Sequence, residues 1–327
     1  MAECPHFTHL LVIPRIRVQN ANSISSPLTH GFPSMTAFLG LMWALERKLS
    51  ETGLDLQFNA VGVVAHHHEE QITQSGFVST LRLTRNPINK DGSTAAIVEE
   101  GRMHMEISLV FAVQSETPPA NAEAAQLLAR QVRDQLAQLR IAGGSVIPSS
   151  APPHKQQPFM VNMPEDDEAK ETLFSRIRLR LLPGFTLVDR QELLEQRHDA
   201  LREDNPDASR LDAWLSLSRI NWHCVANEDP DKKPEWVNDK KGGGWIVPIP
   251  VGYGALSALQ APGLVTNARD GQTPFRFVES LYGIGEWISP HRLQKPEHML
   301  WYADSQADDG LYRCANDYRP VVLHDFD

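Results

Sequence analysis

The sequence predicts an α+β fold with a ferredoxin-like, RRM-like core, and three observations lead to it. Over the first 150 residues, segments with strand and helix periodicity follow in the order strand, helix, strand, strand, helix, strand. Both helical segments carry a single apolar stripe, which suits two helices that cover one face of a four-stranded sheet. A long polar excursion at about 72–102 separates the second strand from the third and predicts a thumb-like hairpin.

Apolar periodicity places each predicted element of this core. In the first strand apolar residues alternate with residues that become basic at Arg15 and Arg17, and Ser34 is a suitable N-cap for the helix that follows. The predicted elements, in chain order, are Leu10–Val18, the helix Met35–Leu49, Leu56–Ala65, Met103–Val113, the helix Asn121–Arg140 and Gly143–Pro148. Such a sheet has a second face, which is predicted to be free for RNA or for more protein.

Beyond the core at 1–150, the composition predicts two further regions. Residues 151–243 begin with a Pro- and Ser-rich linker and continue as a helical insert with helices at Glu171–Leu182, Gln191–Arg202 and Ser209–Ile220. Residues 244–327 are rich in short strands and turns and are expected to pack on the core.

Composition limits the class of protein. The chain has 327 residues, 41% of them hydrophobic and 22% charged, which is ordinary globular usage. Neither a membrane span nor an export signal is expected, and Cys4, Cys224 and Cys314 show no metal or disulfide spacing, so a cytoplasmic chain with reduced thiols is predicted. The net charge of -10 argues against a free-standing, non-specific nucleic-acid binder, although it allows a local basic groove or a basic partner.

Two polar segments could bind a ligand. The loop Gln19–Ser34 joins the first strand to the first helix and is rich in Asn, Ser and Pro, which can donate to phosphates or bases or can simply make turns. In the excursion, Arg82, Arg85 and Lys90 outnumber Asp91. This segment is either a solvated loop or a finger laid over a polyanion.

Four long strings resemble one protein family: LVIPRIRVQNANSISSPLTHGFPSMTAFLGLMWALER (Leu11–Arg47), LTRNPINKDGSTAAIVEEGR (Leu83–Arg102), GWIVPIPVGYGALS (Gly244–Ser257) and NARDGQTPFRFVESLYGIGEWISPHR (Asn267–Arg292). The family is the second subunit of the type I-F CRISPR surveillance (Csy) complex, a Cas5-type member of the RAMP superfamily of RNA-binding proteins. The similarity runs from about Leu11 to Tyr312, whereas Ser149–Lys170 and Asn227–Lys241 match least.

The resemblance implies a non-catalytic subunit without cofactor or metal. Its expected partners are the 5′ handle of the CRISPR RNA, the large subunit, the adjacent backbone subunit, and target double-stranded DNA near the protospacer-adjacent motif, with no membrane. Residue type within the matching blocks then selects the candidate RNA-binding residues: Arg15, Arg17, Asn20, Asn22, Ser23, Ser25, Ser26, Arg82, Arg85, Asn86, Asn89, Lys90, Asn267, Arg269, Arg276 and Arg292.

Two enzymatic alternatives remain open. A metal-independent endoribonuclease that processes repeat RNA would use a histidine as general acid and base, and His30 is the first candidate. A metal-dependent hydrolase would use His66–Glu70, where His66 and His68 would share a face of a strand. Gly252 and Gly254 do not form a dinucleotide fingerprint, and no Walker loop or nucleophile elbow is present.

Overall fold

The computed structural model describes residues 3–320, except 83, 86–87, 89–90, 95–96, 99, 226–233, 241–242, 269 and the side chains of 84–85 and 97–98. Its α-helices are α1 (Met35–Glu51), α2 (Ala122–Leu136), α3 (Asp167–Arg180), α4 (Gln191–Asp204) and α5 (Arg210–Ser218). Short 3-10 helices are η1 (Pro153–Lys155), η2 (Pro290–Arg292) and η3 (Pro296–Met299).

Strands make up most of the remaining regular structure. Those of the first half are β1 (His9–Asn22), β2 (Ile24–Ser26), β3 (Thr29–His30), β4 (Gln57–Glu70), β5 (Ile72–Ser75), β6 (Val78–Leu81), β7 (Thr84–Arg85), β8 (Ile97–Val98), β9 (Arg102–Gln114), β10 (Arg140–Ile141) and β11 (Gly144–Ile147). Those of the second half are β12 (Phe159–Asn162), β13 (Phe185–Asp189), β14 (Trp222–Val225), β15 (Glu235–Asn238), β16 (Ile246–Ala255), β17 (Val278–Ile288), β18 (Trp301–Gln306) and β19 (Leu311–Asn316).

The first 150 residues contain the predicted succession of elements, and the predicted α+β class is confirmed. Within the large sheet, β11, β1, β9 and β4 lie side by side in that order, and each adjacent pair is antiparallel. Helix α1 connects β1 to β4, and α2 connects β9 to β10 and β11. Helix α2 ends at Leu136, earlier than predicted, because the chain turns at 137–139 and forms the β10–β11 hairpin.

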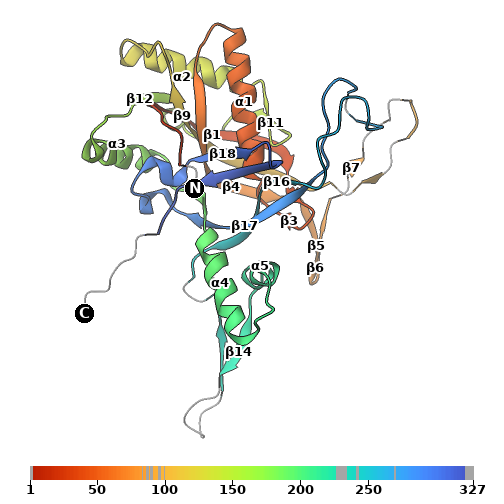
Figure 1. The fold of residues 1–327 in the computed structure, drawn as a ribbon. Coiled ribbons are helices and arrows are strands. Elements are labelled where there is room, and N and C mark those ends of the chain that lie inside the picture. The colour runs from red at the N-terminus through yellow and green to blue at the C-terminus, as the bar shows by residue number, and fades with distance from the viewer. Residues whose placement is uncertain are drawn as a thin grey trace, which may run out of the picture.

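One face of this sheet is covered by α1 and α2 (Figure 1). Phe38 and Leu45 of α1 and Val132 of α2 are completely buried against sheet residues such as Ile13 and Phe111. The side chain of Ser34 caps α1 by accepting a hydrogen bond from the Thr36 amide, as the sequence predicts. The apolar stripes of the two helices therefore form the main core.

The opposite face of the sheet is covered around Leu10, Val12 and Val64, whereas the sequence predicted that this face is free. Leu10, Val12 and Val64 point to that side and are buried beneath Phe174 and Ile177 of α3. Residues around η3 and β18 add to the same cluster. The predicted linker also contains structure, because its strand β12 pairs antiparallel with the start of β1. The second face is thus largely filled by the chain itself.

The sheet continues into the C-terminal third and then returns on itself. Beyond β4 the order is β13, β17, β16, β19 and β18, and Trp301 at the start of β18 pairs with Val61 of β4. Trp301 is fully buried, and its indole N–H donates to the Leu187 carbonyl over 2.8 Å. The C-terminal region therefore joins the core by strand pairing as well as by side-chain packing.

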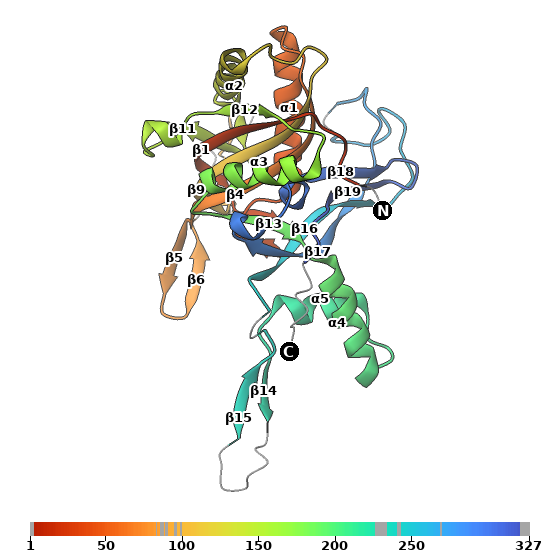
Figure 2. The same ribbon diagram turned by 90° about the vertical axis from the view of Figure 1, so that its left-hand side faces the viewer.

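Three parts extend from this body. The β5–β6 hairpin projects from the end of β4 (Figure 2), within the predicted thumb. Helices α4 and α5 lie beneath the sheet, and the β14–β15 hairpin extends further in the same direction. Among the described residues, no helix is both long enough and apolar enough to cross a membrane.

Candidate functional site

A groove of about 610 Å³ lies beside the first turn of α1. Its walls come from the loop after β1, the exposed side of α1, the turn between β10 and β11, and Tyr253 of β16. Asn22 and Ser25, two of the predicted RNA-binding residues, line it together with Ser34, Arg140 and Gly143. The groove thus brings together segments that are far apart in the sequence.

The loop that forms one wall is held by its own short side chains. Ser25 Oγ lies 2.8 Å from Thr29 Oγ1, and Ser26 Oγ accepts hydrogen bonds from the Leu28 and Thr29 amides over 3.1 and 3.0 Å. The Asn22 side chain likewise exchanges two hydrogen bonds with the Ile24 backbone. Turn chemistry therefore shapes this loop, which fixes the position of its groove-facing atoms.

The β10–β11 turn contacts the end of β1. The Asn22 amide donates to the Ala142 carbonyl over 2.8 Å. A Cβ on Gly144 would lie 2.7 Å from the Ala21 amide nitrogen, so this close approach requires glycine. Arg140 is exposed at the same turn, and its Nη1 donates a hydrogen bond to the Gly143 carbonyl over 3.2 Å. Among the described residues, its other guanidinium donors have no partner.

The groove attracts negative charge. Among the described residues that line it, Arg140 supplies a cationic side chain and none is a carboxylate. The groove also reaches the N-terminus of the 17-residue helix α1, where backbone N–H groups and the helix dipole favour anions. Tyr253 adds an aromatic ring that is 42% exposed and is stacked on its other side against Tyr312. This combination suits a phosphate beside a stacked ring.

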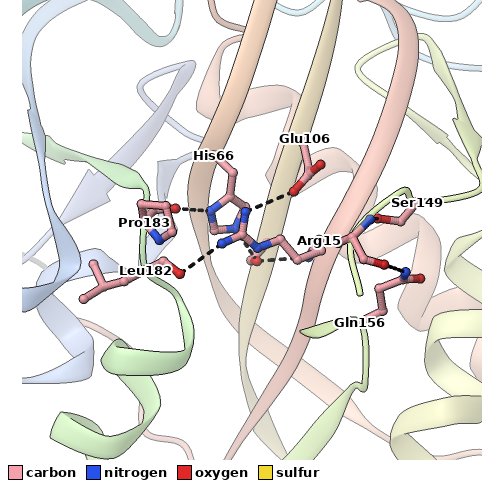
Figure 3. Close-up of polar contacts among 9 residues, drawn as sticks. Arg15, His66, Glu106, Ser149, Gln156, Leu182 and Pro183 are labelled. Carbon is pink, nitrogen blue, oxygen red and sulfur yellow. Dashed lines mark hydrogen bonds and ion pairs between the residues drawn. The ribbon is translucent and has the colours of Figure 1, made fainter. Parts of the chain in front are cut away.

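Arg15 lies in an internal cluster instead (Figure 3). Its side chain is 11% exposed, and it donates to Glu106 and to the Leu182 carbonyl, each over 3.0 Å. Arg15 stands at a β-bulge in β1 with φ 55°, and its amide donates to Ser108 Oγ. These contacts connect β1 and β9 to the turn after α3.

His66 belongs to the same cluster. Its Nδ1 lies 2.6 Å from the Pro183 carbonyl, which can only accept, so Nδ1 carries the proton and Nε2 accepts from Ser108 Oγ at 2.6 Å. Burial lowers the pKa of His66 to about 4, so the ring is neutral. The Ser–His–carbonyl arrangement resembles a nucleophile and its base, but Ser108 is 1% exposed and no substrate can reach it.

His66 and His68 do not share a face of the strand, although the sequence predicted that they would. Strand β4 continues through Glu70, with a bulge between Ala65 and His67. The bulge places His67 opposite Glu106 and His68 opposite Met105, so His66 and His68 point to opposite sides of the sheet. No group of metal-ligating side chains occurs among the described residues.

His30 does acquire a carboxylate partner. Its Nδ1 lies 2.9 Å from Glu70 Oε1, and its side chain is 72% exposed. The strand β4 extends beyond the predicted Ala65, which is why sequence spacing did not reveal this pair.

The other predicted residues do not gather at one point. Arg17 is half-buried on β1, Asn20 Oδ1 accepts from Gln71 over 3.0 Å, and the buried Ser23 Oγ has no partner among the described residues. Arg82 and Asn267 are exposed, and Arg276 donates to the Ala307 carbonyl. The backbone of Arg85 lies in β7, while Asn86, Asn89, Lys90 and Arg269 lie outside the described residues. Arg292 lines a separate cleft.

Sequence reasoning missed Arg140, Gly143 and Tyr253 as groove residues. Arg140 was assigned to the end of a helix, whereas it begins β10. The Gly-Gly pair at 143–144 was the available signal, because a tight turn directly after a basic residue exposes that residue.

The fold and the groove together define an α+β protein with a concave surface that attracts anions. The sequence profile of the family described as "CRISPR-associated protein (Cas_Csy2)" matches residues 11–314. The CRISPR-associated protein Csy2 of Pseudomonas aeruginosa (strain UCBPP-PA14) is 47% identical over 314 residues, which cover 93% of this chain and 94% of that protein. The chain therefore belongs to the Csy2 family of CRISPR-associated proteins, and the predicted family is confirmed.

Proposed function

We propose that this chain is a non-catalytic subunit of the cytoplasmic type I-F CRISPR surveillance complex. It holds the 5′ handle of the CRISPR RNA together with the large subunit, adjoins a backbone subunit, and assists recognition of double-stranded target DNA near the protospacer-adjacent motif. Membership of the Csy2 family supports this proposal.

The fold supports the finer assignment to the Cas5-type RAMP proteins. The strand order β11-β1-β9-β4, with two helices on one face, agrees with the arrangement expected of a ferredoxin-like, RRM-like core. The β5–β6 hairpin stands where the thumb is expected. Because folds host many functions, the proposal relies on the groove and on the family as well as on topology.

The groove beside α1 is the observation that carries the proposal. Asn22, Ser25, Arg140 and Tyr253 all line it, and the Tyr253 residue is 42% exposed. A phosphate would bind Arg140 and the helix N-terminus, while a splayed base would stack on Tyr253. No step of this recognition needs to read sequence, since guide pairing reads the target.

The acidic net charge fits a permanent subunit better than a free RNA-binding protein. With a net charge of -10, long-range attraction to RNA is weak, and binding depends on local sites and on the charge of partners. The thumb residues Arg82, Arg85, Asn86, Asn89 and Lys90 would add contacts to the guide in this proposal.

The ribonuclease alternative is supported by the His30–Glu70 pair alone, since a carboxylate can orient a general base. His30 is 72% exposed and lies outside the groove beside α1, at a concavity of about 80 Å³ that is too small to orient a nucleotide. The non-catalytic proposal is therefore preferred.

Guide retention tests the proposal. The chain is co-expressed with the other Csy subunits and a guide, the particle is isolated by size exclusion, and its RNA is extracted and sized. Arg140→Gln should lower the guide retained after a high-salt wash by about tenfold, because one charge-assisted hydrogen bond is worth ~1.5 kcal/mol or more.

Arg130→Gln is the matched control, because Arg130 is exposed on α2 and lies outside the groove. The proposal fails if particles with Arg140→Gln, like those with the control variant, retain as much guide RNA as particles with the unmodified chain. Cleavage of repeat RNA by the isolated chain, abolished by His30→Ala, would instead establish the ribonuclease.

A further inference from the structure

A second and larger concavity, of about 870 Å³, lies between the helical insert and the C-terminal segment. It is lined by helices α4 and α5, by the start of β16 and by Glu286 of β17. The base of the β14–β15 hairpin and the segment after η2 form the rims. We call this concavity the insert cleft.

The insert cleft carries an excess of positive charge. Among the residues that the structure describes, its lining contains four cationic and two anionic side chains, which are Arg190, Arg197, Lys240 and Arg292 against Asp239 and Glu286. Both carboxylates are occupied: Glu286 pairs with Arg190, and Asp239 lies 3.6 Å from Arg197. This positive excess is local, because the chain as a whole has a net charge of -10.

Lys240 and Arg292 supply the unbalanced charge. Within the described part of the chain, neither side chain has a hydrogen-bond or ion-pair partner, whereas Arg190 and Arg197 are held by carboxylates. Burial lowers the pKa of Lys240, and Asp239 only partly offsets this effect. An anion in the cleft would therefore compensate an ammonium group that has lost part of its hydration.

Two exposed indoles continue from the rim of the cleft. Trp222 and Trp236 are 59% and 62% exposed on the β14–β15 hairpin. The register pairs Trp222 with Asn238 and Cys224 with Trp236, so both indoles project from the same face of the hairpin. The hairpin base at Asp239 and Lys240 is part of the cleft. Aromatic platforms beside a cationic channel are characteristic of proteins that bind single-stranded nucleic acids.

We propose that the insert cleft and the β14–β15 hairpin form a second binding site for a nucleic-acid strand, in which Lys240 and Arg292 contact phosphates and Trp222 and Trp236 stack on bases. The site is separate from the groove beside α1. That groove reaches Tyr253 on β16, whereas the cleft reaches Ile246, roughly 20 Å earlier along the strand.

The shared chemistry is a phosphodiester backbone with unpaired bases, which RNA and single-stranded DNA both offer. An acidic peptide would meet the same cations, but it would leave the two flat indole faces without matching rings. The nucleic acid is therefore the occupant that uses both observations.

Salt-dependent binding tests the proposal on the full chain. Short fluorescein-labelled single strands of RNA and of DNA, with equivalent sequences, are titrated by fluorescence anisotropy over a range of NaCl concentrations. Each phosphate contact contributes about 0.7 to the slope of log K against log salt for single strands. The double variant Lys240→Gln with Arg292→Gln should reduce the magnitude of that slope by about 1.4.

Three further chains make the result specific. The control removes one Arg and one Lys elsewhere, Arg130→Gln with Lys155→Gln, and should leave the slope unchanged because both residues are exposed outside the two concavities. The charge-retaining variant Lys240→Arg with Arg292→Lys should restore the slope. Trp222→Ala with Trp236→Ala should weaken binding by at least about fivefold, since stacking is worth ~1–3 kcal/mol per base.

An unchanged slope in the charge-removing variant overturns the proposal, as does a chain that binds neither oligonucleotide. Poly-glutamate that displaces the strands and depends on the same cations would assign the cleft to an acidic peptide instead. Stronger binding of RNA than of DNA points to the guide, and the reverse points to target DNA. Guide retention in the assembled particle, which depends on Arg140, is measured separately, so the two proposals can fail independently.

Discussion

At the scale of single residues, the polar cluster around His66 has a structural role. Arg15 pairs with Glu106 and donates to the Leu182 carbonyl, while His66 donates to the Pro183 carbonyl and accepts from Ser108. These contacts lie where β1, β4 and β9 meet the turn after α3. Arg15 was predicted to bind RNA, but its side chain is 11% exposed and already paired. A basic residue next to a β-bulge can be turned inward, and single-sequence alternation does not show that turn.

The neutral state of His66 leads to a pH dependence. Its pKa is about 4 in the folded chain and near 6.5 in the unfolded chain, so only the unfolded chain takes up this proton between those values. The contribution to stability is therefore complete above pH 6.5 and is lost as the pH falls toward 4, by up to about 1.4 kcal/mol per pH unit.

The measurement is urea unfolding at several pH values from 7 to 4. His66→Gln should show a flatter fall in the unfolding free energy than the unmodified chain, and the exposed His67→Gln should follow the unmodified chain. Burial also lowers the pKa of His298 and raises that of Asp189, but both groups are present in every chain compared. Equal slopes for all three chains would show that His66 is not neutral in the folded state.

At the scale of elements, β16 shows why one glycine is required. Gly252 sits at a bulge with φ +155°, and a Cβ there would lie 2.0 Å from the Tyr312 carbonyl oxygen of the neighbouring strand. Gly254 faces only the Leu281 side chain, whose nearest atom would lie 3.3 Å from a Cβ. The two glycines look alike in the sequence, but only Gly252 would place a Cβ against backbone atoms, those of Tyr312 and Arg313.

Gly252→Ala should therefore destabilise the chain by more than about 2 kcal/mol and loosen the pairing of β16 with β19. Gly254→Ala, the matched control, should cost under about 1 kcal/mol, because the Leu281 side chain can rotate away. Thermal unfolding compares the two variants, and amide exchange of β19 reports on the pairing. Similar losses in both variants would contradict the assigned close approach.

Local periodicity predicted most elements, and tertiary pairing decided the remainder. The helices α1, α4 and α5 begin and end within a few residues of their predicted bounds, because each has an apolar stripe or a cap. Strand β12 was assigned to a linker, since a four-residue strand in a Pro-rich segment is visible only through its partner β1. The β14–β15 hairpin lay in a charged segment and was likewise missed.

The candidate groove was predicted only in part for the same reason. Its loop residues Asn22 and Ser25 were recognisable as short polar side chains, but the groove is completed by Arg140 and Tyr253, which are far away in the sequence. No local sequence pattern predicts that these segments lie close together in the fold. The strand pairings that carry β16 and the β10–β11 turn to their places bring them together.

At the scale of the whole molecule, the large sheet joins both concavities into one body. Strand β13 pairs with β4 and, on its other edge, with β17, which leads into the C-terminal strands. The last of these in the sheet order, β18, also pairs with β4. The groove beside α1 and the insert cleft are both built partly on β16, so this frame holds them in a fixed relation.

The most direct test of the central claim is to map where the guide lies on this subunit. The assembled particle is cross-linked with ultraviolet light, digested, and analysed by mass spectrometry for peptides that carry a nucleotide. Cross-linked peptides from Gln19–Ser34 and from the segment around Arg140 are predicted, because those residues form the groove. A guide-containing particle in which this subunit carries no cross-link in either segment would contradict the account.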